Sequence, residues 1–125
     1  MPIVTLTEEN IDTIIDSNPL VLIDFWAQWC GPCRIFSEVY ATAASQHPDI
    51  VFGKVNIEEQ PQLRVGFNVR AVPTLVVFRE GVIIYNDSGS LSQTALEEVI
   101  QKAKALNVEQ MHKDLQEQDK KNPSK

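Results

Sequence analysis

Cys30 and Cys33 are the residues of this chain whose type and spacing best suit chemistry. Thiol–disulfide exchange needs a thiolate that attacks and a second thiol close enough to break the resulting mixed disulfide. Pro32 suits the first turn of a helix, so we expect Cys30 at a helix N-terminus, where unpaired amide groups and the helix dipole favour a thiolate. Cys33, one turn into that helix, should be more shielded. The pattern therefore predicts Cys30 as the nucleophile and Cys33 as the resolving thiol.

Two inert core thiols, or half of a zinc site, are the alternatives for this pair. Structural zinc takes about four ligands, and His47 and His112 lack the short spacing of histidine ligands in such sites, so no metal is predicted. In a reducing compartment, two cysteines three positions apart are more typical of a reactive pair than of a structural bridge. We therefore favour redox catalysis.

The overall composition narrows the class of protein. A chain of 125 residues, 43% hydrophobic and 22% charged, is typical of one compact domain. Its net charge of -6 disfavours a nucleic acid or an anionic membrane as partner. The longest apolar runs, 20–23 and 75–78, are far shorter than the ~20 residues of a membrane-spanning helix. Residues 1–5 lack the features of a secretory signal, so we expect a cytoplasmic protein.

Apolar patterning predicts alternating strands and helices over residues 1–106. The segment from Leu20 to Trp26 is apolar on both sides except for Asp24, which is typical of a central strand buried on both faces. The predicted order is β-α-β-α-β-α-β-β-α, an α/β fold with helices on both faces of a mixed sheet. The strands are expected at 3–6, 20–26, 51–57, 74–79 and 82–86. Helices are expected after an N-cap at Thr7, from Pro32 to about His47 and after an N-cap at Ser92, with a short helical or irregular crossover at 61–67.

The last 19 residues differ in composition from the rest of the chain. Residues 107–125 contain no aromatic residue and no glycine, and they mix acidic with basic side chains. This predicts a domain over 1–106 followed by a charged C-terminal helical extension or flexible tail over 107–125. Val108, Met111 and Leu115 form an apolar stripe at helical spacing, which could extend the last helix or dock on a partner.

Residues 3–106 resemble the thioredoxin family. The stretches that carry the resemblance are 24–33 (DFWAQWCGPC), 54–57, 72–74, 78–81 and Gly89. The resemblance implies a thioredoxin fold and a monomeric protein-disulfide reductase that works by dithiol–disulfide exchange. It also implies disulfide-containing client proteins as substrates, recycling by a separate thioredoxin reductase, and no bound cofactor.

The resemblance also assigns roles to individual residues. It implies a cis peptide bond at Val72–Pro73 facing the cysteines, with the client backbone paired beside it. A carboxylate in an apolar strand should have a raised pKa, and the resemblance makes Asp24 the group under Cys33 that takes its proton. The residues implied for chemistry are Cys30, Cys33, Asp24 and Lys54, and those for client binding are Trp29, Gly31, Pro32, Val72, Pro73 and Gly89.

Purely structural roles for three of these residues are also compatible with the sequence. Asp24 could lie at a strand end and reach water, Lys54 could point outward, and Trp29 could simply fill the core. One residue departs from the family pattern: Glu38 stands where many thioredoxins have a helix-kinking proline, so we expect a straighter helix here.

Two other functions are compatible with the sequence. One is a disulfide oxidant or isomerase on the same fold. The other is a binding module that works through the apolar surface around Trp29, Val72 and Pro73, or through the tail. Gly31 and Pro32 between the cysteines resemble the reducing branch of the family, so we favour a reductase.

Overall fold

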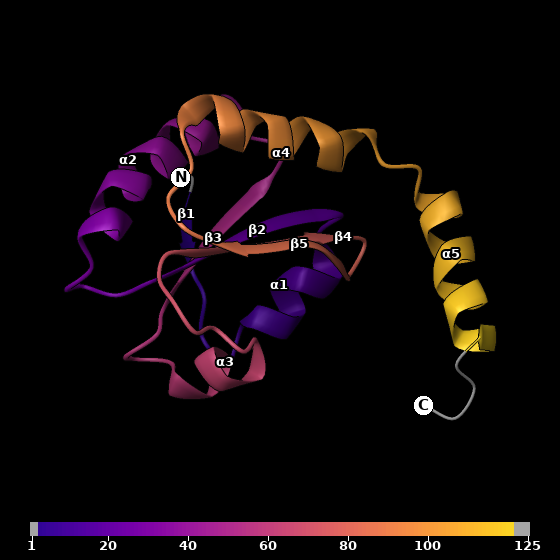
Figure 1. The fold of residues 1–125 in the computed structure, drawn as a ribbon, viewed down its shortest axis with the longest axis horizontal. Helices are drawn as coiled ribbons and strands as arrows, with labels where there is room; N and C mark the ends of the chain where they lie inside the picture. Colours follow the sequence, from indigo (N-terminus) through magenta and orange to yellow (C-terminus); the bar gives the residue numbers. More distant parts are fainter. Residues whose placement is uncertain (1–2, 122–125) are drawn as a thin grey trace.

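A computed structural model describes residues 3–121 of the chain. Its strands form one sheet in the order β1-β3-β2-β4-β5, with helices on both faces (Figure 1). The strands are β1 Ile3–Thr5, β2 Leu20–Trp26, β3 Val51–Asn56, β4 Thr74–Arg79 and β5 Val82–Ser88. The helices are α1 Ile11–Ser17, α2 Gly31–Gln46, α3 Pro61–Gly66, α4 Gln93–Ala105 and α5 Val108–Lys121.

The sheet is mixed, as the sequence predicted. β1 and β2 run parallel to β3, whereas β4 runs antiparallel to both β2 and β5. Glu80 and Gly81 form the two-residue turn between β4 and β5, and both have positive φ, 51° and 79°. Turns of this kind match the twist of a hairpin, which is why a glycine suits the second position. β2 lies at the centre of the sheet.

The two faces of the sheet carry two hydrophobic cores. α1 and α3 cover one face, and α2 and α4 cover the other (Figure 1). Val21 and Ile23 of β2 belong to the first core, whereas Leu20 and Leu22 belong to the second. Because side chains alternate along a strand, Asp24 follows Leu20 and Leu22 onto the face that α2 covers.

One predicted helix start is confirmed and one is wrong. Ser92 caps α4, its Oγ accepting the amide of Ala95 at 3.1 Å. Thr7 does not cap α1, which begins at Ile11. Instead, the Oδ1 atom of Asn10 accepts the Thr7 amide at 2.8 Å, which closes a turn over 7–10. Short polar side chains that bond to nearby backbone in this way compete with helix formation, and here they delay it by one turn.

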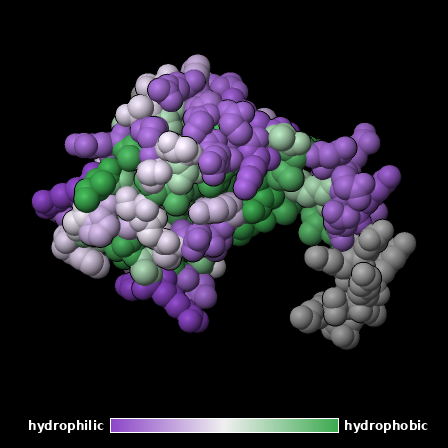
Figure 2. Space-filling view, turned by 45° about the horizontal axis from the view of Figure 1, so that its top comes forward, coloured by the Kyte–Doolittle hydropathy of each residue, from purple (hydrophilic) through white to green (hydrophobic). Residues whose placement is uncertain are grey.

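The tail is helical but does not continue α4. Leu106 is extended, with φ -61° and ψ 135°, and the Oδ1 atom of Asn107 accepts the amide of Gln110 at 2.9 Å at the start of α5. α5 projects from the body of the molecule (Figure 1), and hydrophobic surface gathers where the two meet (Figure 2). Residues 122–125 of the predicted tail lie outside the described residues.

No helix within residues 3–121 has the length and apolar character needed to cross a bilayer.

Candidate active site

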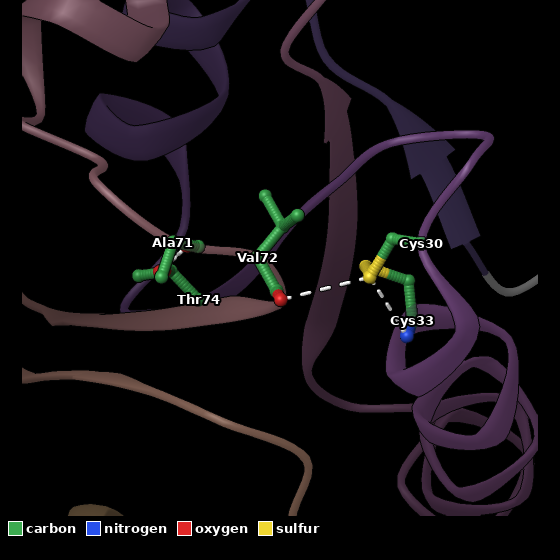
Figure 3. The surroundings of a disulfide bond; sticks show 5 residues. All are labelled: Cys30, Cys33, Ala71, Val72 and Thr74. Atoms are coloured by element: carbon green, nitrogen blue, oxygen red, sulfur yellow. Dashed lines mark hydrogen bonds between the residues drawn. A yellow bond between two sulfur atoms is a disulfide. The ribbon is translucent and has the colours of Figure 1, made fainter.

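The cysteine pair stands at the N-terminus of α2, as the sequence predicted. Cys30 is the N-cap residue, and a disulfide joins it to Cys33, with 5.2 Å between their Cα atoms. The Sγ atom of Cys30 accepts the backbone N–H of Cys33 at 3.1 Å (Figure 3). In the reduced protein, this amide and the helix dipole favour negative charge on the Cys30 sulfur.

The expected difference in shielding between the two cysteines is not found in this disulfide form. Cys30 and Cys33 are each 4% exposed. The disulfide ties both sulfurs into one environment, so the structure distinguishes them by hydrogen bonding rather than by burial. Trp29, next to the pair, is 67% exposed, which excludes a core-filling role for this side chain.

The loop before β4 faces the cysteine pair. The Val72–Pro73 peptide bond is cis, as the resemblance implied. The Val72 carbonyl oxygen lies 3.6 Å from the Sγ atom of Cys30 (Figure 3). The hydroxyl of Thr74 donates to the Ala71 carbonyl at 2.6 Å and holds this loop from behind. Backbone from a segment about 40 residues away in sequence thus meets the sulfur directly.

Gly89 supports the same loop from the end of β5. Its amide donates to the Pro73 carbonyl at 2.8 Å. Its φ of 110° is a conformation that residues with a side chain rarely adopt. Gly89 therefore positions the loop next to the cysteines through its backbone.

Asp24 is buried beside the cysteine pair and does not reach solvent at a strand end. It is 4% exposed, and burial raises its pKa to about 7, an effect that the nearby Lys54 ammonium partly opposes. Lys54 is the register partner of Asp24 on β3, and its Nζ atom lies 5.9 Å from the centre of the Trp26 ring. A carboxyl group with this pKa can accept and release a proton near neutral pH.

A pocket of about 400 Å³ connects Asp24, Cys33 and Lys54. The structure therefore brings together Cys33 and the two charged residues that the family resemblance implied beside it. Sequence reasoning assigned no site role to the other polar residues that line this pocket, among them Ser37. The i, i+4 spacing of Ser37 from Cys33 could have revealed it, because such residues share a helix face.

α2 runs without interruption through Glu38, as expected for a helix with no proline beyond its first turn. Glu38 is exposed and also lines the pocket beside Asp24. Among residues 3–121, no group of three or more His, Cys, Asp or Glu side chains is arranged to hold a metal ion.

A mixed sheet covered on both faces, with a disulfide at the start of a helix and a cis-proline loop against it, defines a thiol–disulfide oxidoreductase of the thioredoxin fold. The Thioredoxin family model matches residues 2–102. The chain belongs to the thioredoxin family.

Relatives and solved structures agree with this assignment. A Streptomyces coelicolor protein named thioredoxin 2 is 46% identical over 115 residues, which are 92% of this chain and 86% of that protein. Thioredoxin C-3 of Corynebacterium nephridii is 40% identical over 96 residues, 76% of this chain and 66% of that protein. The structure of a mutant thioredoxin from Halobacterium salinarum superposes with a TM-score of 0.79 at 32% identity, covering 85% of this chain and 94% of that one.

Proposed function

We propose that this thiol–disulfide oxidoreductase reduces protein disulfides, with Cys30 as the attacking sulfur and Cys33 as the resolving one. The observation that carries the assignment is the Cys33 amide donating to the Sγ atom of Cys30 at 3.1 Å. Because of this hydrogen bond, the Cys30 sulfur is the more easily ionised of the two in the reduced protein. The Cys30 thiolate attacks one sulfur of a client disulfide, and the other client sulfur leaves with the electron pair of the broken bond.

The second step releases the client. The Cys33 thiol gives its proton to Asp24 and attacks the Sγ atom of Cys30. The remaining client sulfur leaves as a thiolate, and the Cys30–Cys33 disulfide forms. Two electrons have then passed to the client, and the protein is in its oxidised form. The position of Asp24 in the pocket that Cys33 lines supports its role as proton acceptor, and the nearby Lys54 keeps the pKa of this carboxyl from rising further.

Client binding is proposed at the surface around the disulfide. Trp29, just before the cysteine pair in the chain, and Ile35, just after it, are 67% and 66% exposed and offer a client apolar contact. Gly31 and Pro32 are exposed at the turn into α2. The client backbone is proposed to lie beside the Val72–Pro73 loop, whose carbonyl faces Cys30.

The remaining parts of the proposal concern the cellular setting. The family implies that a separate reductase returns the Cys30–Cys33 disulfide to the dithiol. We place the protein in the cytoplasm, as a monomer with no bound cofactor. Reduction of this disulfide by a purified thioredoxin reductase, with and without residues 107–125, tests the partner and the contribution of the tail.

Cysteine variants test the mechanism. Cys30→Ser should abolish reduction of insulin disulfides, because no nucleophile remains. Cys33→Ser should accumulate a mixed disulfide between Cys30 and the client, visible by mass spectrometry of the intact protein. A Cys30→Ser variant that still reduces insulin, or a Cys33→Ser variant that traps no client, would contradict the assigned roles.

A further inference from the structure

Glu38 is the second carboxylate that lines the Asp24 pocket. Asp24 lies on the buried side of this pocket, whereas Glu38 is exposed on α2. The pocket volume of about 400 Å³ is large compared with the roughly 30 Å³ that one water molecule occupies in the liquid, so several water molecules fit between the two groups. The pocket thus leads from the buried carboxyl group to a carboxylate at the surface.

Three buried polar side-chain atoms have no partner among the residues that the structure describes, and two of them belong to residues that line this pocket. They are the Oδ1 atom of Asp24, an acceptor when ionised, and the Nε1 atom of Trp26, a donor. Buried polar atoms in proteins are nearly always hydrogen-bonded, to water where the protein offers nothing. Both atoms are too enclosed for water to touch them in this arrangement, but the other oxygen of the Asp24 carboxyl group is not closed off in this way. Water in the pocket can therefore meet the carboxyl group at that oxygen and provide a path for a proton.

We propose that Glu38 passes the proton of Asp24 to and from bulk solvent through water in this pocket. The inference rests on the proposed function, in which Asp24 takes the Cys33 proton in each turnover. That proton leaves the Asp24 carboxyl group, crosses the pocket water to the Glu38 carboxylate and is released to solvent. The client thiolate takes its proton from solvent, so protons balance and no further electrons move.

Glu38 suits this role better than the other residues that line the pocket. A relay needs a group that accepts a proton and then gives it up. Arg34 and Lys54 carry donors without an acceptor when charged, and the amide of Gln28 is neither acid nor base near neutral pH. Glu38 acts through Asp24 and not on the sulfurs, so we regard it as a positioning residue for the proton.

The two chemical steps can be separated with dithionitrobenzoate, a chromogenic disulfide. Attack by Cys30 releases the first thionitrobenzoate, and attack by Cys33 releases the second, so stopped-flow absorbance follows both phases. Glu38→Gln should leave the first phase unchanged and slow the second about tenfold in dilute buffer, less than the roughly 10²-fold expected on losing the proton acceptor itself in Asp24→Asn. Glu38→Asp should restore most of the rate.

Buffer rescue distinguishes a relay from a structural effect. Imidazole, a small acid–base molecule, should return the second phase of Glu38→Gln toward the parent rate as its concentration rises. Glu98→Gln is the matched control, since Glu98 is also an exposed helical glutamate but lies on α4 away from the Asp24 pocket. It should behave as the parent protein at every imidazole concentration.

Some outcomes would overturn the inference. A second phase in Glu38→Gln that matches the parent rate, or a slowing that imidazole does not relieve, would show that Glu38 is no relay. If Asp24→Asn still slows that phase, the proposed function survives and only the role of Glu38 is lost. If Asp24→Asn has no effect on it, the role of Asp24 in the proposed function is wrong as well.

Discussion

Buried polar groups near the two ends of α2 differ in their hydrogen bonding. At the N-terminal end, the Oδ1 atom of Asp24 is buried beside Cys33 without a hydrogen-bond partner among the described residues. At the C-terminal end, His47 is 9% exposed and both of its ring nitrogens are paired. Its Nε2 atom lies 2.9 Å from Oε1 of Glu97, and its Nδ1 atom lies 3.1 Å from Nζ of Lys104.

This difference separates a site for chemistry from a structural contact. Charged partners fix the His47 ring in one orientation, with Nε2 facing the Glu97 carboxylate and Nδ1 facing the Lys104 ammonium. This network joins the end of α2 to α4. Asp24 has no such partners, so its proton can be exchanged. The buried carboxyl group without a hydrogen-bond partner among the described residues, at one end of α2, serves the proposed chemistry. The fully paired histidine at the other end stabilises the fold.

The largest expected effect is on stability at the reactive end. Burial raises the pKa of Asp24 from 3.8 to about 7. Well below pH 3.8, Asp24 is protonated in both the folded and the unfolded chain, so its ionisation does not affect stability. As the pH rises to about 7, only the unfolded chain gains by ionising, which destabilises the fold by roughly 4 kcal/mol.

Asp24→Asn removes this effect, so its free energy of unfolding should rise relative to the parent protein between pH 4 and pH 7 and then level off. Urea denaturation at a series of pH values measures the difference. Asp16→Asn, at an exposed position on α1, is the control and should show no such rise. A stability difference between Asp24→Asn and the parent that does not change with pH would contradict the raised pKa of this carboxyl group.

Local patterns in the sequence predicted the reactive end of α2 well. The position of Cys30 follows from Pro32 in the first helical turn, and burial of Asp24 follows from the apolar residues around it in β2. Both depend on near neighbours in the chain. The same local reasoning was wrong at Thr7, because the side chain of Asn10 competes for its backbone.

Long-range contacts could not be predicted in this way. The approach of the Val72 carbonyl to Cys30 was implied only by the family resemblance. The pairing of His47 with Glu97 and Lys104 depends on how α4 packs across α2, and these residues are about 50 positions apart. The sequence singled out Glu38 only because many thioredoxins have a proline at this position. Its place in the Asp24 pocket could not be predicted, because it depends on how α2 lies over β2 and β3.

A smaller effect is expected at the structural end of α2. His47→Ala removes both ring contacts and should lower the free energy of unfolding by about 1.5–3 kcal/mol, the usual range for hydrogen bonds to charged groups. The rate of insulin reduction should stay unchanged, because the cysteines lie at the other end of the helix. Loss of insulin reduction at temperatures where the variant is folded would mean that the two ends of α2 are coupled.

Glu97 gives a second measurement on the same variant. The hydrogen bond from His47 is the main cause that holds the pKa of Glu97 below its usual value, and a hydrogen bond from Gln101 adds to it. In His47→Ala, the pKa of Glu97 should therefore rise, which NMR titration of its carboxyl carbon would detect. An unchanged pKa would show that the contact does not persist in solution.

The smallest effect is expected in the middle of α2, where Tyr40 combines features of both ends. It is buried, and its hydroxyl donates to the Gly53 carbonyl at 2.7 Å. Tyr40→Phe should lower the free energy of unfolding by about 1 kcal/mol, because it removes one satisfied hydrogen bond and keeps the ring packed against Phe52. Both thionitrobenzoate phases should be unchanged, because burial raises the pKa of the Tyr40 hydroxyl well above its usual value and the hydroxyl keeps its proton in the bond to Gly53. A slower second phase in a stable Tyr40→Phe variant would instead place this hydroxyl with Asp24 in the proton path. The reactive region would then extend from the N-terminal end of α2 to its middle.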